Sequence, residues 1–170
     1  FFLANFPYYR LRKFAPLLLV INFILLLAIF IPGLGVEVNE ARRWLGFGGL
    51  TIQPAEFTKI SLIIFTAAFL SRKANKIYDF WQTSFIPLLV LAISFGLILK
   101  QPDLGTALAI GATIALMLFA AGMPLGQFFG LGLLALPAVI YTVFAEEYRL
   151  RRLFSFLDPW EDPLGTGYHI

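Results

Sequence analysis

Five apolar runs, each near the length of a membrane crossing, constrain this chain more than any other feature of its sequence. A helix needs about 20 predominantly apolar residues to cross the hydrocarbon core of a bilayer. The first run contains a single polar side chain, Asn22, and the fourth contains no charged residue. The runs cover residues 15–36, 55–70, 85–99, 104–123 and 125–144. This pattern predicts an all-α, polytopic helical membrane protein with about five transmembrane helices.

The composition agrees with a membrane protein and excludes several functional classes. Only 14% of the 170 residues are charged and 59% are hydrophobic, whereas soluble domains carry about 25% charged residues. The absence of cysteine excludes a cysteine nucleophile and a cysteine metal site. His169 is the only histidine, so a histidine metal cluster is excluded too. The net charge of +3 is small and dispersed, and we expect no nucleic-acid partner.

The ends of the chain suggest a piece of a longer protein. The sequence opens at Phe1 without methionine or a signal-peptide pattern, and it stops at Ile170 without a closing element. We therefore expect residues 1–170 to be an internal fragment that forms a single membrane domain. Residues 148–170 would begin a large loop outside the membrane.

The charges of the loops do not orient these helices. Cytoplasmic loops usually carry the excess of lysine and arginine. Alternating spans divide the connecting segments into two sets of three, and each set carries six basic residues. Residues 8–14, 71–84 and 123–126 form one set, and residues 37–53, 100–103 and 145–170 form the other. Charge alone therefore leaves the orientation open.

A proline followed by an acid–base pair opens the second span. Pro54 is tolerated in the first turn of a helix, and Glu56 and Lys59 then lie three residues apart on one helix face. In one interpretation, Lys59 extends to the membrane interface beside Glu56. In the other, the two residues form an intramembrane ion pair that faces a polar cavity, because unpaired charges are costly there. The position of Lys59, a full turn inside the span, favours the second.

Two further loops carry candidate polar residues. Arg43 stands beside an interfacial tryptophan, Trp44, and taken alone this pair is typical of an aromatic belt next to a solvated charge run. Gln101 and Pro102 precede Asp103, which can cap the following helix. Capping alone is a sufficient explanation of Asp103.

The charged tail holds the remaining candidates. Arg149 and Arg152 fall on one helical face, and arginine forks bind phosphate groups in a bidentate manner; a cytoplasmic membrane anchor explains them equally well. Asp158, Glu161 and Asp162 could hold a divalent cation, a hard ion that prefers oxygen ligands. Turn formation by the Asp-Pro pairs is the favoured explanation of these acids, so no cofactor is firmly predicted.

Four motifs, in order, resemble the SEDS family of shape, elongation, division and sporulation proteins, which includes FtsW, RodA and SpoVE. They are similar to the family patterns N-G-A-x-R-W, Q-P-[SA]-E-x-x-K, Q-P-D-x-G-[TS] and R-x-x-x-F-x-D-P-W-x-D-P-x-G-x-G-Y. Glu40 replaces the glycine of the first pattern, and His169 follows the last where glutamine is usual. The matching residues are Asn39, Ala41, Arg43 and Trp44; Gln53, Pro54, Glu56 and Lys59; Gln101, Pro102, Asp103, Gly105 and Thr106; Arg152, Phe156, Asp158, Pro159, Trp160, Asp162, Gly165, Gly167 and Tyr168.

The resemblance implies a fold of ten membrane helices in the bacterial cytoplasmic membrane, of which this chain would supply five. It places residues 8–14 and 71–84 in the cytoplasm and the arginine-rich loops, with the active side, outside. It also implies polymerisation of lipid II into glycan strands of peptidoglycan during division or elongation, with a class B penicillin-binding protein as partner. Such a glycosyl transfer requires a base at the attacking hydroxyl and positive charge at the departing pyrophosphate.

The family's essential catalytic aspartate would lie beyond Ile170, so we expect no catalytic residue here; Asp158 and Asp162 do not replace it. Two alternatives stay open, a lipid II flippase and a non-catalytic scaffold of the division machinery. The residues expected to bind substrate are Arg43, Glu56, Lys59, Gln101, Asp103, Arg149, Arg152, Asp158 and Asp162.

Overall fold

The structure, a computed structural model, describes residues 8–38, 41–47, 50–146 and 150. The chain divides into two compact units, residues 1–125 and residues 126–170, which are described separately. The described residues of the first unit form four main helices, three short helical segments and a small sheet. The main helices are α1 (Leu11–Ala28), α2 (Pro54–Arg72), α4 (Phe85–Leu99) and α5 (Leu104–Ala120); the short segments are η2 (Tyr8–Arg10), η3 (Ala74–Lys76) and α3 (Phe80–Thr83).

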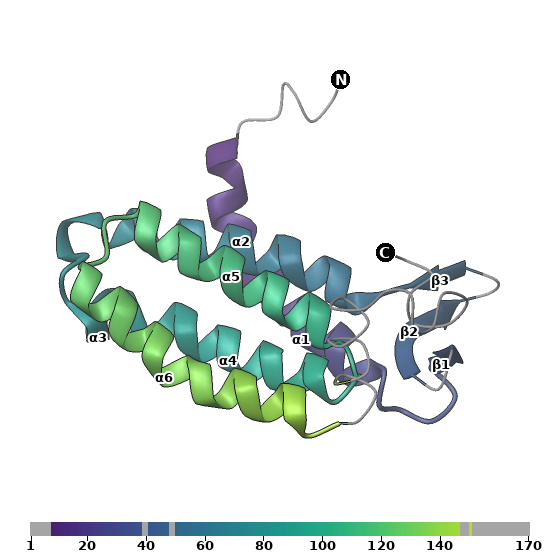
Figure 1. Cartoon of the computed structure of the whole chain (residues 1–170). Helices are drawn as coiled ribbons and strands as arrows, with labels where there is room; N and C mark the ends of the chain where they lie inside the picture. Colours follow the sequence, from purple (N-terminus) through teal and green to yellow (C-terminus); the bar gives the residue numbers. More distant parts are fainter. Residues whose placement is uncertain (1–7, 39–40, 48–49, 147–149, 151–170) are drawn as a thin grey trace, which may run out of the picture. The chain divides into compact units, whose positions relative to one another are not determined.

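Consecutive main helices of the first unit run in opposite directions, because each connection joins the end of one helix to the start of the next at the same end of the unit. Helices α1 and α4 run toward the sheet, whereas α2 and α5 begin beside it and run away (Figure 1). Pro54 occupies the start of α2, where its missing N–H would have no partner inside the helix. Helices α1, α2 and α6 (Leu125–Phe144) are long and apolar enough to cross a membrane, and α4 and α5 are shorter apolar helices. The helical membrane fold predicted from the sequence is confirmed.

The predicted bounds hold for the third and fifth spans, differ by one to three residues for the second and fourth, and fail for the first. Residues 85–99 and 125–144 were predicted as found, whereas the span expected at 15–36 is a helix over Leu11–Ala28. The chain leaves the helix after Ala28 and turns through Gly33, whose φ of 90° lies in the region that favours glycine. The apolar residues after this helix therefore serve a turn and a strand.

Residues expected to form a polar loop instead contain a three-stranded antiparallel sheet, in the order β1-β2-β3. Its strands are β1 (Gly35–Val38), β2 (Ala41–Phe47) and β3 (Leu50–Ile52). Gly35 pairs with Leu45, and Leu45 pairs with Ile52. A Cβ atom on Gly35 would lie 2.4 Å from the carbonyl oxygen of Ile29, so only glycine fits there. This close approach fixes the sheet against the end of α1.

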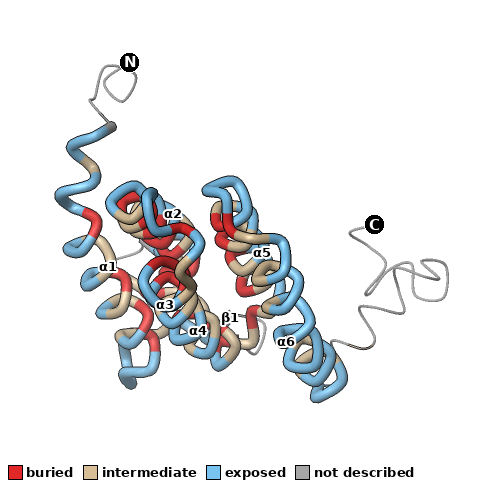
Figure 2. Tube along the Cα trace, turned by 90° about the vertical axis from the view of Figure 1, so that its left-hand side faces the viewer, coloured by how far each residue is buried: buried red, intermediate tan, exposed pale blue. Residues whose placement is uncertain are grey.

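The core of the first unit lies on the facing sides of its helices (Figure 2). Its apolar members recur at intervals of three and four residues, as expected for one helix face. On α5 the buried stripe consists of Ala107, Ile110, Ile114 and Leu118. Buried Thr58, Ser61 and Thr66 on α2 and Ser94 on α4 add small polar residues, a composition typical of helix contacts in membranes.

The described part of the second unit consists of helix α6 from its second residue, Gly126, to Phe144, together with Ala145, Glu146 and Leu150. The helix continues past Pro137, and none of its residues is buried. Large exposed side chains occupy all of its length, including Phe129, Leu134 and Tyr141. This distribution suits a helix surrounded by an apolar environment.

Candidate functional site

Asp103 joins two segments at the end of the bundle where α2 and α5 begin. One carboxylate oxygen, Oδ1, accepts a hydrogen bond from the backbone N–H of Thr106 at 3.1 Å, and this bond caps α5. The other, Oδ2, accepts a hydrogen bond from Nε2 of Gln53 at 3.1 Å, and Gln53 directly precedes α2. The predicted cap is confirmed. Because both oxygens are engaged, Asp103 also fixes the spacing between the starts of the two helices.

Arg43 binds the turn between α4 and α5. From strand β2 its Nε donates to the carbonyl oxygen of Gln101 at 3.0 Å, and its Nη2 donates to the carbonyl oxygen of Pro102. A helix leaves its last carbonyl oxygens without partners inside the helix, and a guanidinium group supplies several donors in a planar fork. Arg43 therefore holds the sheet against the turn, and the structure commits at least two of its donors to this contact.

Gln101 lies beneath the surface of this end. Its side chain is 1% exposed, and its Nε2 donates to the carbonyl oxygen of Leu26 at 3.5 Å, the limit of a hydrogen bond. Its Oε1 is buried and has no hydrogen-bond partner among the described residues. The structure thus places Gln101 as a contact between the α4–α5 turn and α1.

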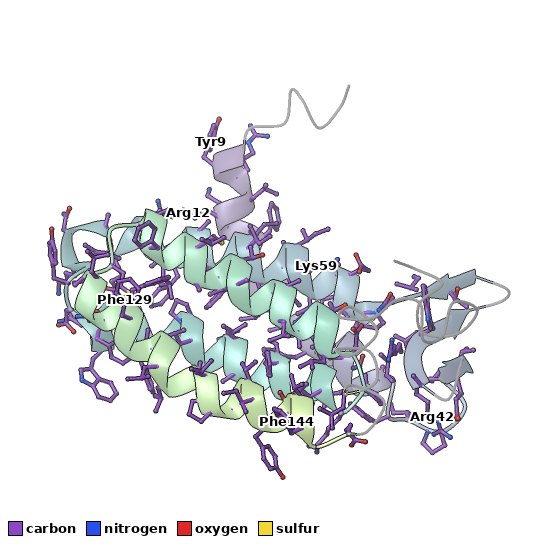
Figure 3. The ribbon with its side chains drawn as sticks, viewed as in Figure 1. Tyr9, Arg12, Arg42, Lys59, Phe129 and Phe144 are labelled. Carbon is purple, nitrogen blue, oxygen red and sulfur yellow. The ribbon has the colours of Figure 1, made fainter. Side chains whose placement is uncertain are left out.

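Glu56 and Lys59 form the ion pair that their spacing predicts. Nζ of Lys59 lies 2.7 Å from Oε2 of Glu56. The side chains are 39% and 58% exposed for Lys59 and Glu56, respectively, so the pair lies on the outer surface of α2 in the first unit (Figure 3). Exposed pairs of this kind contribute little to stability, and these charges are accessible to a ligand.

Asn22, the single polar side chain of the first apolar run, contacts Thr58 on α2, a partner that the sequence did not indicate. The Thr58 hydroxyl lies 2.6 Å from Oδ1 of Asn22 and 3.0 Å from the carbonyl oxygen of Pro54, and all three residues are buried. Two acceptors then compete for one proton, while Nδ2 of Asn22 is left without a partner. With the amide turned over, Nδ2 donates to the Thr58 hydroxyl and the hydroxyl donates to Pro54, and we favour this assignment because Nδ2 then has an acceptor and the hydroxyl keeps one. Either way, the contact fixes α1 against the first turns of α2.

The remaining predicted residues lie outside the described part of the chain. They are Arg149, Arg152, Asp158, Glu161 and Asp162. Within residues 8–38, 41–47 and 50–146, no group of three or more histidine, cysteine, aspartate or glutamate residues could hold a metal ion. The divalent cation stays a prediction for the tail alone.

The described candidates therefore gather at one end of the first unit. Arg43 lies in β2, Gln101 and Asp103 lie in the turn before α5, and Glu56 lies in the first turn of α2. Gln53 was not among the residues expected to bind substrate, although it belongs to the same motif as Pro54, Glu56 and Lys59. Its signal was a polar side chain placed directly before a helix that begins with proline.

Comparisons with known proteins point to one family, and its profile matches the whole chain. The profile of the Cell cycle protein family of FtsW, RodA and SpoVE matches residues 1–170. Stage V sporulation protein E of Bacillus subtilis (strain 168) is 43% identical over 171 residues, which cover 100% of this chain and 46% of that protein. The probable peptidoglycan glycosyltransferase FtsW of Trichlorobacter lovleyi is 44% identical, covering 94% of this chain and 42% of that protein.

A solved structure of a peptidoglycan synthase complex, which concerns the coordination of polymerization and crosslinking, contains a chain with a similar fold. The TM-score is 0.75 at 31% identity, and the match covers 99% of this chain and 49% of that one. The chain spans less than half the length of the curated relatives reported above. With four ordered motifs, a matching fold and a profile that covers every residue, the chain belongs to the FtsW, RodA and SpoVE family of cell cycle proteins.

Proposed function

We propose that this chain is part of a peptidoglycan glycosyltransferase that polymerises lipid II at the outer face of the bacterial cytoplasmic membrane. The observation that carries the proposal is the convergence of three family motifs at one end of the first unit, through the contacts of Arg43 and Asp103. Relatives that cover nearly the whole chain carry the name of this activity. The proposed orientation places the sheet outside the cell.

In this proposal the described residues divide into two groups. Arg43, Gln53, Gln101 and Asp103 are positioning residues, since their polar atoms bind one another or the backbone. Lys59 carries an accessible charge, held at a fixed place on α2 by Glu56. A cation there can bind the anionic part of a polyprenyl pyrophosphate substrate.

Residues outside the described part complete the proposal. The catalytic base is proposed to follow Ile170 in the same loop, and Arg149 and Arg152 are proposed to bind the departing pyrophosphate. Asp158 and Asp162 belong to the same loop. A class B penicillin-binding protein is the proposed partner, and the relative solved within a peptidoglycan synthase complex supports this assignment.

The test is lipid II polymerisation by the full-length protein with its partner, reconstituted in detergent and followed by the formation of glycan strands. Lys59→Ala should reduce polymerisation at least tenfold while the melting temperature stays within about 2 °C. Lys100→Ala is the matched control, because Lys100 is an exposed lysine directly before the turn between α4 and α5 and has no role in the proposal.

Three results would count against the proposal. Equal activity of Lys59→Ala and wild type would remove Lys59 from the site. Transport of fluorescent lipid II across vesicles without any polymer would favour the flippase instead. Polymerisation that persists when this protein is omitted from the complex would leave it as a scaffold.

A further inference from the structure

The end of the first unit opposite the sheet contains a small pocket between α1 and α2. Its lining combines two arginines, Arg12 and Arg72, with apolar side chains that include Phe65 and Phe69. The rings of Phe65 and Phe69 lie 6.0 Å apart, and Nη2 of Arg72 donates to the carbonyl oxygen of Arg12 at 3.5 Å. We call this site the basic pocket; Ala15, Pro16 and Ala68 complete its lining.

The cations around the basic pocket have no acidic partner in the described part of the chain. Within the described residues, ion pairs join Arg42 to Glu37 and Lys59 to Glu56, and both pairs lie far from the basic pocket. The acid closest in sequence to Arg72 is Asp79, whose carboxylate caps α3 and accepts from Gln82. Both pocket arginines are exposed, and Arg10, Lys13 and Lys73 flank them in the sequence. The positive charge of this end is therefore not balanced within these residues.

The position of the basic pocket relates it to the membrane surface. It lies between the first turns of α1 and the last turns of α2, and both helices are long and apolar enough to cross a bilayer. Figure 3 shows Arg12 beside the first turns of α1 and Arg42 at the opposite end of the unit. At the ends of membrane-spanning helices, the acyl-chain region of a bilayer gives way to its headgroups.

We propose that the basic pocket binds an acidic phospholipid, with the headgroup phosphate between Arg12 and Arg72. Basic pockets between transmembrane helices are a recurrent way to bind anionic headgroups, and arginine forks match the geometry of phosphate oxygens. The pocket has only about 30 Å³ of free volume. It therefore admits a small part of the lipid, and the acyl chains lie over the apolar side chains of Phe65 and Phe69.

A lipid fits this pocket better than free phosphate does. Most of the lining is apolar, and a hydrated ion would gain nothing from that surface, whereas acyl chains would. The inference does not rest on the proposed function, because neither Arg12 nor Arg72 belongs to the candidate site. Lipid binding can accordingly be measured without any assay of catalysis.

The experiment measures retention of phosphatidylglycerol and phosphatidylcholine by the full-length protein, using native mass spectrometry after titration in detergent. One variant carries Arg12→Gln with Arg72→Gln. The matched control carries Arg42→Gln with Lys100→Gln, which removes the same charge from exposed positions at the other end. Each basic residue contributes about fivefold to binding of anionic lipid, so the pocket variant should bind phosphatidylglycerol roughly 30-fold more weakly.

The expected result is this loss in the pocket variant, with near wild-type binding in the control. An equal loss in both variants would show general electrostatic attraction and would overturn the inference. So would equal affinity of the wild type for the two lipids, or displacement of phosphatidylglycerol by millimolar inorganic phosphate. If the pocket variant does not fold, Arg12→Lys with Arg72→Lys replaces it: these lysines keep the charge without the fork, and unchanged binding would exclude recognition by arginine geometry.

Discussion

The two ends of the first unit use their arginines differently. At the sheet end, Arg42 pairs with Glu37 and Arg43 binds two backbone carbonyls, so both side chains are engaged by the protein itself. At the other end, Arg12 and Arg72 line a pocket, and neither has an acidic partner in the described part of the chain. The difference teaches that position in the fold, rather than residue type, decides whether an arginine stabilises the protein or is available to a ligand.

The largest expected effect follows from exchanging arginine for alanine at each end. Arg43→Ala removes two charge-assisted hydrogen bonds from half-buried carbonyls and should lower the free energy of unfolding by about 2–4 kcal/mol. Arg72→Ala removes an exposed side chain with a long hydrogen bond, 3.5 Å, to the carbonyl oxygen of Arg12, and should change the free energy of unfolding by less than about 0.5 kcal/mol. Thermal unfolding of both full-length variants in the same detergent checks the pair. Similar losses at the two ends would break the comparison.

A smaller effect is expected from adding one methyl group at the sheet. In Gly35→Ala the new Cβ would meet the backbone of Ile29, which cannot rotate away, and we expect a cost of about 1–3 kcal/mol. Gly46→Ala is the matched control in the neighbouring strand, since its Cβ would meet only the side-chain Cγ2 of Val36 at 2.7 Å. Melting temperatures should rank Gly35→Ala below Gly46→Ala. The reverse order would mean that the contact between β1 and the end of α1 does not hold the sheet.

The smallest effect is expected at the exposed pair on α2. Glu56→Gln removes the ion pair with Lys59 and should cost no more than about 0.5 kcal/mol, because both side chains are exposed and exposed pairs contribute little to stability. Raising the salt concentration should shrink the difference further. A loss of more than about 1 kcal/mol in the free energy of unfolding would show that the pair stabilises the fold. Lys59 would then belong with the positioning residues rather than be available to a ligand.

The sequence predicted the local features of this fold and missed the distant ones. The cap by Asp103, the start of α2 at Pro54 and the spacing of Glu56 and Lys59 all depend on residues within one helical turn, and each is confirmed. The bond between Gln53 and Asp103 joins residues 50 positions apart, so no local pattern could reveal it.

The sheet and the buried stripe of α5 show the limits of pattern reading. Residues 37–53 are polar and rich in turn formers, and only the backbone pairing distinguishes three short strands from a loop. The uncharged run over residues 104–123 does not indicate which face of α5 packs against the protein. The buried face turns out to be Ala107, Ile110, Ile114 and Leu118, because α5 packs against two helices, α2 and α4.

The contact of Arg43 with the carbonyl of Gln101 has a consequence for biogenesis. The two residues are 58 positions apart, and synthesis at about 5–20 residues per second separates them by roughly 3–12 s. During that interval α1 and α2 can enter the bilayer as a hairpin, while the guanidinium group of Arg43 has no turn to bind. A ribosome-arrested chain that ends before Gln101 should therefore leave residues 41–47 open to protease, and a chain extended through α5 should protect them.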